Sequence, residues 1–422
     1  MKLTATLTGV TQRAATNSAG LFAFPLLKPG LYVVSVTRNG FRTTIERADV
    51  LLGQTTSMQL KLSVGATSED VEVSATGQLL QTEDANLTTD YQVRQIENLP
   101  NPGNDLTNVA QTAPGIMMNT AGDMGAFTTF GLPAVSNLFT INGSDYNDPF
   151  YNVNNSGASN LLLGANEIQE VAVVTNSYTG QYGRQAGAQI NYTTKSGTNS
   201  YHGNLSYFWT GRSMDANDWS NNFNDTPRPF QNNNQWMASL GGPIKKNKIF
   251  FFVNTEGLRY IFGTSNQVFL PAPLFQSEVL SNLPAASVPF YQEMFNLYNS
   301  AAGFKRAVPV MDCCSSYTPI NPAIGTNCLV TYRDATTNGN QEWLLSARVD
   351  VNLTEKDKFF GRWKMDRGYQ PTYTDPISPV FNDGSNQPIR RGPIELHARV
   401  RPKCSKQFYW LDPLLFVRFW QS

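Results

Sequence analysis

The sequence predicts a mainly β protein with three parts: a small N-terminal β-sandwich, a mixed α/β domain, and the first strands of an antiparallel transmembrane β-barrel, which is incomplete. Residues 342–367 alternate strictly between apolar and polar side chains on both sides of a tight turn. Charged residues make up only 15% of the chain, whereas they reach about 25% in ordinary soluble domains. No apolar run approaches the about 18 residues of a transmembrane helix, so a membrane crossing would have to use strands.

Residues 1–64 are predicted to form the sandwich. Apolar residues alternate from the N-terminus, at Phe22 and Phe24, from Tyr32 to Val36, and over 58–64. Turn residues separate these runs about every eight to twelve positions, which is typical of sandwiches. The N-terminus lacks a basic segment followed by an apolar one. We therefore expect the natural start to lie upstream of Met1; a cytosolic protein is the alternative.

Residues 65–199 have a mixed pattern that predicts an α/β domain. We expect a short helix over 91–99, which ends at Pro100, and a second helix that Asn104 caps and Pro114 stops. Short strands are predicted in three further segments, namely 69–74, 139–143 and 167–174.

Residues 200–386 are predicted to form five barrel strands. Apolar residues alternate over 205–209, 236–240 and 249–253, and the hairpin at 342–367 adds two strands. A short turn at 241–247 separates long loops, which we place at 212–234 and 260–341. Short and long connections at opposite ends are typical of outer-membrane barrels.

The hairpin predicts which face meets lipid. Successive strand side chains point to opposite faces. One face is apolar, and the other carries Arg348, Asp350, Arg362, Lys364 and Asp366. An ordinary two-sided antiparallel sheet is the alternative. On the membrane reading, Val349→Arg is expected to cost roughly 2–4 kcal/mol near the midplane, whereas Asp350→Asn on the lumen face is expected to be mild.

Residues 387–422 are predicted to leave this pattern. We see no period of two there, and basic residues such as Arg390, Arg391 and Lys403 crowd the segment. We interpret it as a frameshifted or chimeric end; a basic tail on the membrane surface is the alternative.

Two resemblances follow from these motifs. Gly20-x-Phe22-x-Phe24, followed by Pro29-Gly30-x-Tyr32-x-Val34-x-Val36 and Gly40-Phe41, resembles the carboxypeptidase regulatory-like domain, without its usual Asp near Ser18 and without its first strand. That name implies a transthyretin-like accessory fold, sometimes linked to carbohydrate binding, and no peptidase activity.

The second resemblance lies in residues 65–199, which resemble the plug domain of TonB-dependent outer-membrane receptors. The residues that carry it follow one another in the family's order: Phe139-Thr140-Ile141-Asn142-Gly143, Ile168-x-x-Val171-x-Val173, Tyr182-Gly183, and Ile190-Asn191 leading to Thr194-Lys195-Ser196-Gly197. Asn142 replaces the usual Asp. The last motif and the N-terminal domain together are typical of the Oar-like branch.

This resemblance implies a transporter or receptor, here a fragment, in the outer membrane of a Gram-negative-type bacterium. Its implied partners are a TonB-type energy-transducing complex, outer-membrane lipid and an unknown extracellular ligand. The ligand is expected near the apical loops 117–130 and 145–155. The candidate ligand contacts are the aromatic residues of these loops, Phe127, Phe130, Tyr146, Phe150 and Tyr151; alternatively, they wedge the plug against the wall. A surface adhesin or a carbohydrate-binding sandwich protein without transport is the alternative function.

The sequence offers no enzyme chemistry. The two histidines, His202 and His397, lack the spacing of metal ligands, and no nucleotide-binding motif occurs, so we expect no catalytic residue, cofactor or metal. Equal numbers of basic and acidic residues, 32 each, argue against nucleic-acid binding. Cys328 is expected to form a disulfide with Cys313 or Cys314, and free thiols are the alternative.

Overall fold

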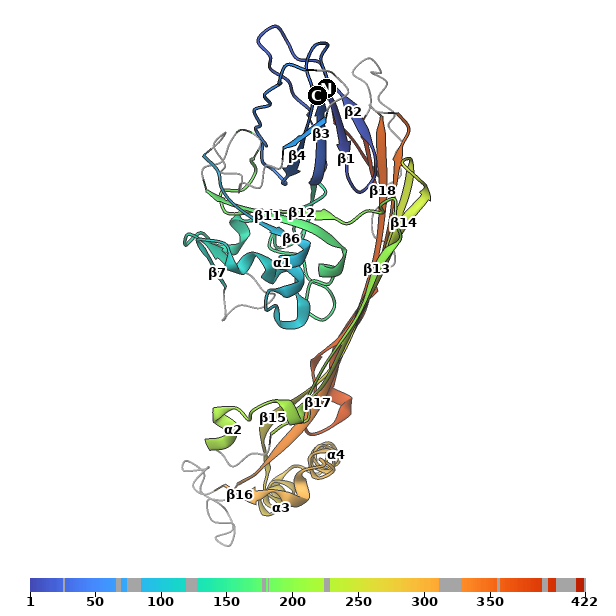
Figure 1. The fold of residues 1–422 in the computed structure, drawn as a ribbon. Coiled ribbons are helices and arrows are strands. Elements are labelled where there is room, and N and C mark those ends of the chain that lie inside the picture. Colours follow the sequence, from blue (N-terminus) through green and yellow to red (C-terminus); the bar gives the residue numbers. More distant parts are fainter. Residues whose placement is uncertain are drawn as a thin grey trace.

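Figure 1 shows the computed structural model of the chain, in which an N-terminal domain lies at one end, two helices lie at the other, and a long sheet runs between them. The structure describes residues 1–25, 27–65, 70–73, 85–118, 127–176, 180, 182–223, 228–310, 328–354, 357–388, 394–399 and 415–420.

The N-terminal domain is one five-stranded sheet with a covering layer. Its strands, in the order β2-β1-β3-β4-β5, are β1 (Lys2–Ala5), β2 (Thr11–Arg13), β3 (Gly30–Val36), β4 (Thr43–Val50) and β5 (Asp70–Val73). The predicted runs at Phe22 and Phe24 and at 58–64 are not strands. Phe24, Met58 and Leu60 nevertheless pack on the core of the sheet, so alternation in these segments marks the second layer.

The central domain is built on a second five-stranded sheet; we call its residues 85–199 the plug domain after the resemblance of the predicted domain 65–199. This sheet has the order β10-β9-β12-β11-β6, with β6 (Leu87–Gln92), β9 (Leu138–Ile141), β10 (Ser144–Asp145), β11 (Ile168–Asn176) and β12 (Gln189–Thr194). Short elements cover it: α1 (Val93–Asn98), η1 (Pro102–Asn104), η2 (Leu106–Thr112), η3 (Ala134–Ser136), η4 (Ala165–Glu167) and the hairpin of β7 (Ile116–Met118) and β8 (Phe127–Thr129).

The predicted second helix differs in type and cap. It is the 3₁₀ helix η2, and its cap is Asp105, whose carboxylate accepts the Thr107 N–H at 2.7 Å; Asn104 lies in the preceding turn at a φ of 50°. Burial raises the pKa of Asp105 to about 6. The expectation that Asn104 caps this helix was therefore wrong by one residue.

The third part is a long antiparallel sheet with one plug-facing side, which we call the barrel sheet. Its main strands are β13 (His202–Gly211), β14 (Asn232–Lys245), β15 (Ile249–Pro271), β17 (Leu329–Asn352) and β18 (Lys358–Tyr373), paired in that order. They contain all five predicted strands. The short turns between β14 and β15 and between β17 and β18 lie at the end near the N-terminal domain (Figure 1).

The predicted loop 260–341 is largely ordered structure. β15 and β17 have 23 and 24 residues and pair along their whole length, although about 9–11 residues suffice to cross a membrane. The pair of strands β15 and β17 is therefore much longer than a bilayer crossing requires, and we call the part beyond the crossing the stalk. Beyond it lie α3 (Pro273–Asn282) and α4 (Val288–Asn299); η6 (Phe304–Arg306) and β16 (Val308–Pro309) follow before β17. The connection from β13 to β14 holds η5 (Arg212–Met214) and α2 (Trp219–Phe223).

None of the helices in the described ranges has the length and apolar character needed to cross a membrane.

The sheet continues past residue 386, where we expected it to stop. After η7 (Pro379–Phe381), β19 (Asp383–Pro388) and β20 (Ile394–Arg399) both pair antiparallel to β18. Ile394, Leu396 and Ala398 do alternate with polar residues, a period of two that our interpretation missed. β21 (Leu415–Trp420) pairs parallel to β20 and so departs from the antiparallel order.

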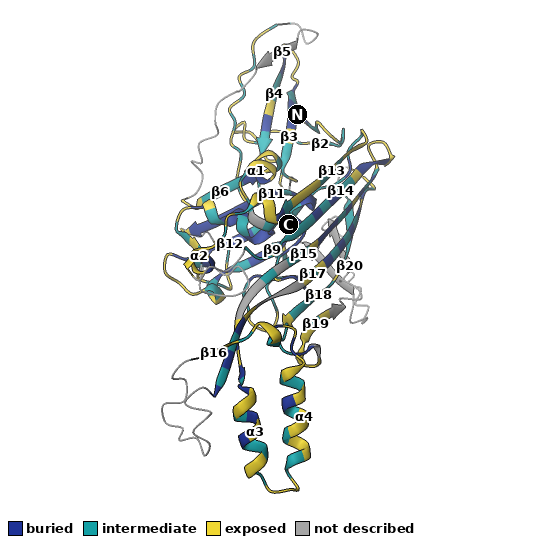
Figure 2. Ribbon diagram, turned by 90° about the horizontal axis from the view of Figure 1, so that it is seen from below, coloured by how far each residue is buried: buried dark blue, intermediate teal, exposed yellow. Residues whose placement is uncertain are grey.

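Burial on the barrel sheet is inverted relative to a soluble protein. Val349 is 41% exposed on the outer face of β17, while its neighbours Arg348 and Asp350 are 5% and 2% exposed. Leu205 and Leu240 on β13 and β14 are exposed in the same way. Figure 2 colours the strands of the sheet by burial. The predicted apolar outer face and charged inner face are therefore confirmed. A long apolar surface turned outward, with charge sealed inside, suits contact with hydrocarbon.

Candidate functional site: the interface between plug and barrel sheet

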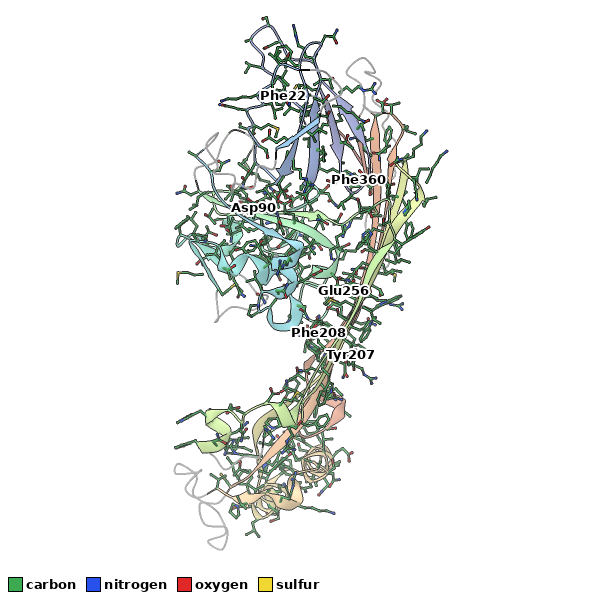
Figure 3. The ribbon with its side chains drawn as sticks, in the orientation of Figure 1. Phe22, Asp90, Tyr207, Phe208, Glu256 and Phe360 are labelled. Carbon is green, nitrogen blue, oxygen red and sulfur yellow. The ribbon has the colours of Figure 1, made fainter. Side chains whose placement is uncertain are left out.

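The inner face of the barrel sheet holds the plug through polar contacts. In Figure 3, Glu256 lies on the side of the sheet that faces the plug, and Phe360 lies where the N-terminal domain meets the sheet. The apolar part of this interface is small among the described residues: Leu163 of the plug packs on Leu258 and Leu344. Hydrogen bonds and ion pairs make up most of the rest.

Glu256 on β15 accepts hydrogen bonds from the turn that precedes β11. Its carboxylate accepts the Gly164 N–H at 2.9 Å and the Asn166 N–H at 3.0 Å. Both amides lie at the start of η4, where a helix lacks internal acceptors for its first N–H groups. The Asn166 side chain also donates to Asn254 at 2.7 Å. The barrel thus caps a plug turn whose own sequence provides no side-chain cap.

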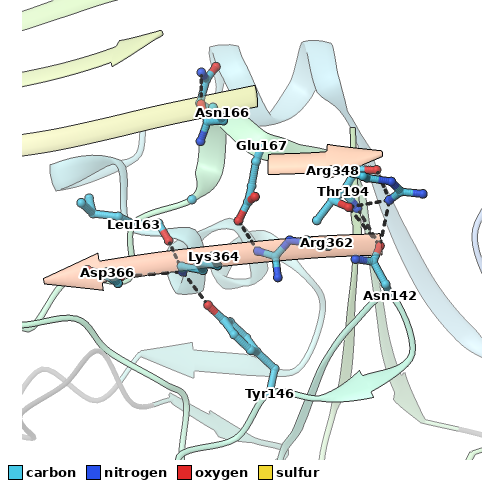
Figure 4. Close-up of polar contacts among 12 residues, drawn as sticks. Asn142, Tyr146, Leu163, Asn166, Glu167, Thr194, Arg348, Arg362, Lys364 and Asp366 are labelled. Carbon is cyan, nitrogen blue, oxygen red and sulfur yellow. Dashed lines mark hydrogen bonds and ion pairs between the residues drawn. The ribbon is translucent and has the colours of Figure 1, made fainter. Parts of the chain in front are cut away.

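Glu167 forms a buried ion pair with the barrel. Its Oε1 lies 2.6 Å from Arg362 Nη2, and both side chains are almost fully buried (Figure 4). Burial alone would raise the pKa of Glu167, but the charges of Arg362 and Lys364 hold this pKa below its ordinary value. Lys364 in turn donates to the Tyr146 hydroxyl at 2.9 Å. The carboxylate therefore stays ionised in a site that excludes water.

Arg348 holds the end of β12 and the tip of the β9–β10 hairpin. It donates to Thr194 Oγ1 at 2.6 Å and to Asn142 Oδ1 at 3.4 Å (Figure 4). Asn142 and Gly143 both have positive φ, 49° and 81°, as a two-residue type I′ turn requires. Asn tolerates this conformation well. The strand predicted at 139–143 therefore ends at Ile141, and Asn142 and Gly143 form the turn that follows it. The Asn142 side chain also contacts the barrel sheet.

The motif Thr194-Lys195-Ser196-Gly197 marks the passage from plug to barrel. A Cβ on Gly197 would collide with the backbone carbonyls of Phe251 and Gly242 on β15 and β14. The chain can therefore run this close to the sheet only with glycine. This close approach gives a physical reason for the glycine in the motif.

The five predicted ligand-contact aromatics occupy different environments. Phe127 is 1% exposed and packs edge-to-face on Phe139 in the plug core. Tyr146 lies on the wall, with Lys364 Nζ 5.6 Å from its ring centre. Phe130, Phe150 and Tyr151 are exposed, at 57%, 88% and 64%. Phe127 and Tyr146 therefore pack within the protein, and a ligand-binding role for any of the five stays a prediction.

The remaining predicted site residues concern cysteines and metals. Cys328 is buried and disulfide-bonded. Cys313 and Cys314 lie outside the described residues, so the pairing stays a prediction. Within the described ranges, no group of three or more His, Cys, Asp or Glu side chains is arranged to hold a metal ion.

Sequence reasoning missed Glu167, Glu256 and Glu342 as interface residues. Glu342 accepts the Ser159 N–H at 2.8 Å from the plug. The alternation placed Glu342 on the same face as Arg348 and Asp350. A row of charges on the concealed face was therefore a usable signal for a polar partner inside the barrel.

Comparisons with known proteins follow the same division. A model described as an outer membrane beta barrel domain matches residues 193–398, and one described as a carboxypeptidase regulatory-like domain matches residues 2–63. The TonB-dependent transporter Oar of Myxococcus xanthus is 26% identical over 254 residues, which cover 57% of this chain and 23% of that relative. The chain thus spans less than a quarter of the length of this curated relative.

Solved structures give weaker likenesses. The ferric enterobactin receptor PfeA of Pseudomonas aeruginosa, in a mutant form, is 14% identical with a TM-score of 0.40, over 68% of this chain and 35% of that one. The outer membrane transporter YddB of Escherichia coli is 13% identical with a TM-score of 0.35, over 67% and 39%. The family models and the curated relative confirm the regulatory-like domain, the outer-membrane barrel domain and the Oar-like resemblance.

Proposed function

We propose that this Oar-like chain, with its carboxypeptidase regulatory-like domain ahead of an outer membrane β-barrel domain, works in TonB-dependent uptake across an outer membrane. The observation that carries the proposal is the inverted burial of the barrel sheet, with apolar side chains outside and Glu256, Arg348 and Arg362 sealed beneath the plug. An uptake protein needs such a wall, because its outer face meets lipid while its inner face holds a removable polar domain.

The plug interface supports movement of the plug. Polar contacts can be exchanged for contacts with water, so their net contribution to stability is small, about 0.5–1.5 kcal/mol for a typical hydrogen bond. The apolar cluster at this interface has three buried members among the described residues, Leu163, Leu258 and Leu344, with Leu161 and Tyr260 packed against them. A pull on the plug by an inner-membrane energy-transducing complex would then admit water along the wall and open a path without unfolding the plug core.

The ligand is proposed to contact the exposed aromatics of the plug. Phe150 and Tyr151 lie side by side, with ring centroids 5.8 Å apart, and Phe130 is held at a positive φ of 48°. Such exposed aromatic pairs favour ring-bearing or amphipathic ligands. The role of the chain is then binding and transport rather than catalysis.

Surface attachment without transport is the second candidate. The stalk of β15 and β17 and the helices α3 and α4 favour it, because they project beyond the wall and present exposed side chains such as Phe290. An adhesin would use this projection while the plug stayed fixed.

A thiol-accessibility experiment separates the two functions without knowledge of the ligand. Ser159 is 6% exposed and lies against Glu342 of the wall, so a Ser159→Cys thiol is shielded while the plug is seated. We expect a water-soluble maleimide to label it in outer membranes only when the energy-transducing complex is present and energised. Ser200→Cys, at an exposed position, is the control and is labelled in both states. Protection of Ser159→Cys under all conditions would instead favour attachment.

A further inference from the structure

The N-terminal domain contacts the inner face of the barrel sheet at Asp350. Lys28, just ahead of β3, places its Nζ on Asp350 Oδ1 of β17 in a close ion pair, and it lies 5.7 Å from the ring centre of Phe360. The Lys28 side chain is 49% exposed, whereas that of Asp350 is 3% exposed. The lysine can therefore leave for water without any opening of the barrel, while the aspartate cannot.

Asp350 is shared between the N-terminal domain and the plug contact. Its carboxylate accepts Arg348 Nε at 2.8 Å and Nη2 at 2.9 Å. The third nitrogen, Nη1, is left to hold Thr194 of the plug, at 2.6 Å from its Oγ1 and 3.1 Å from its carbonyl oxygen. The Arg348 guanidinium also stacks 4.1 Å from the ring centre of Phe360. One short chain of contacts thus joins the three domains.

A cavity lies beside this chain of contacts. It has a volume of about 410 Å³, and its lining includes Lys28, Asn142, Asp350 and Phe360. Lys28 and Asp350 therefore pair at the edge of a space large enough for water. If the lysine left, water would compete for Asp350 Oδ1, which is also the acceptor for Arg348 Nη2. Hydration weakens an ion pair because it raises the local dielectric constant.

We propose that Lys28, Asp350 and Arg348 form a latch, through which docking of the regulatory-like domain sets how firmly the barrel holds the plug at Thr194 and Asn142. With Lys28 in place, Asp350 fixes Arg348 in the orientation that binds the plug. With Lys28 released, Asp350 holds Arg348 less firmly, and the hydrogen bonds from Arg348 to Thr194 and Asn142 weaken. Coupling of this kind is reciprocal, so displacement of the plug also favours undocking of the domain. The latch requires only the folded chain and does not depend on transport.

Hydrogen–deuterium exchange of the full chain folded in detergent tests the latch. Lys28→Gln is expected to speed exchange of the Thr194 amide, which donates to Asn142 Oδ1, by about two- to five-fold, the range of a half-exposed ion pair. Lys61→Gln makes the same charge change at an exposed position of the same domain and should leave this amide unchanged. Lys28→Arg keeps the charge and should restore protection.

Salt gives a second measurement that needs no folded variant. High ionic strength screens exposed ion pairs far more than buried ones. In the unmodified chain, exchange at Thr194 should therefore quicken between low and high salt, and where Lys28→Gln folds this response should be absent. The latch is overturned if Lys28→Gln changes exchange only within the N-terminal domain, or if salt leaves Thr194 of the unmodified chain unaffected.

Discussion

The plug core and the inner face of the barrel sheet bury side chains of different chemistry. The plug core is apolar, with Phe139, Val171, Ile190 and Tyr192 among its buried residues. The barrel face buries Glu256, Glu342, Arg348, Asp350 and Arg362. Apolar burial resists partial opening, since each methylene exposed to water costs free energy, whereas polar groups that leave the wall can form hydrogen bonds with water instead. The comparison indicates that the plug is stable as a folded unit. Its polar contacts with the inner face of the barrel sheet, which we call the seat, can instead be exchanged for contacts with water.

The largest effect is expected from damage to the plug core. Phe139→Ala removes a ring that packs on Phe127 and Tyr192 and leaves a cavity, so the free energy of unfolding of the plug should fall by about 3–5 kcal/mol. Phe150→Ala removes a ring that is 88% exposed and should change stability by less than about 0.5 kcal/mol. Denaturant titration followed by plug-specific fluorescence measures both. Equal effects would contradict the division between core and surface.

Plug seating should weaken when one member of the Glu167–Arg362 ion pair is removed and should recover when both are removed. Arg362→Met leaves Glu167 ionised and buried, so plug seating should weaken by about 3 kcal/mol. The double variant Glu167→Leu with Arg362→Met removes both charges and should recover most of this loss. Protection of a Ser159→Cys thiol reports seating in each case. A double variant as weak as Arg362→Met alone would show that the pair is not the unit of stability.

Local patterns predicted much of this comparison, and distance in sequence limited the rest. The alternation in 342–367 gave the inner and outer faces correctly, because strand geometry is local. The partner of each charge was beyond reach, since Glu167 and Arg362 are 195 residues apart. Phe127 was placed near a ligand because its loop is apical, but burial depends on packing that the sequence does not display.

One further expectation, the long loop at 260–341, was wrong for a physical reason, and another is revised. The strand pairing of 260–271 with 329–340 extends an existing ladder, and its middle, 263–267 with 333–337, is mostly polar, so continuous apolar alternation does not mark it. The mild effect expected of Asp350→Asn stays a prediction, but Asp350 is buried on the inner face, so a larger effect is now expected. It pairs with both Arg348 and Lys28, and its neutralisation would leave Arg348 buried beside a weaker partner.

The outer face of the same strand offers the next smaller effect. Val349 lies three residues before the end of the long strand β17, between the expected midplane and the interface, so Val349→Arg should lower barrel stability by about 2 kcal/mol in lipid. Val349→Leu keeps the face apolar and should be near neutral. Refolding titrations in lipid vesicles measure the difference. If the arginine were harmless, this face would be meeting water, and the inverted burial would lose its explanation.

The smallest effect should appear where the N-terminal domain meets the plug sheet, because that contact contains acids that prefer to be neutral. Burial raises the pKa of Glu170 to about 7, with Asp90 and Asp49 adding like charge, and it raises the pKa of Asp90 to about 7. Glu170 accepts the Leu52 N–H at 2.8 Å, and Asp90 accepts the Gln54 side chain. The two acids therefore join the domains best when protonated.

The sign of the pH dependence follows from these pKa values. A carboxyl whose folded pKa is raised contributes stability below its unfolded pKa of about 4 and loses that stability as pH rises through about 7. Docking of the N-terminal domain should therefore weaken between pH 5 and about 8, as measured by exchange of the Leu52 amide. Glu170→Gln keeps the acceptor without the charge, so it should reduce this dependence and protect Leu52 better than the unmodified chain at high pH. Glu46→Gln, a change on β4 away from this contact, should leave the pH dependence as it is. An unchanged pH profile in Glu170→Gln would mean that Glu170 is ionised when docked, and that this contact resembles the charged seat of the plug more than its apolar core.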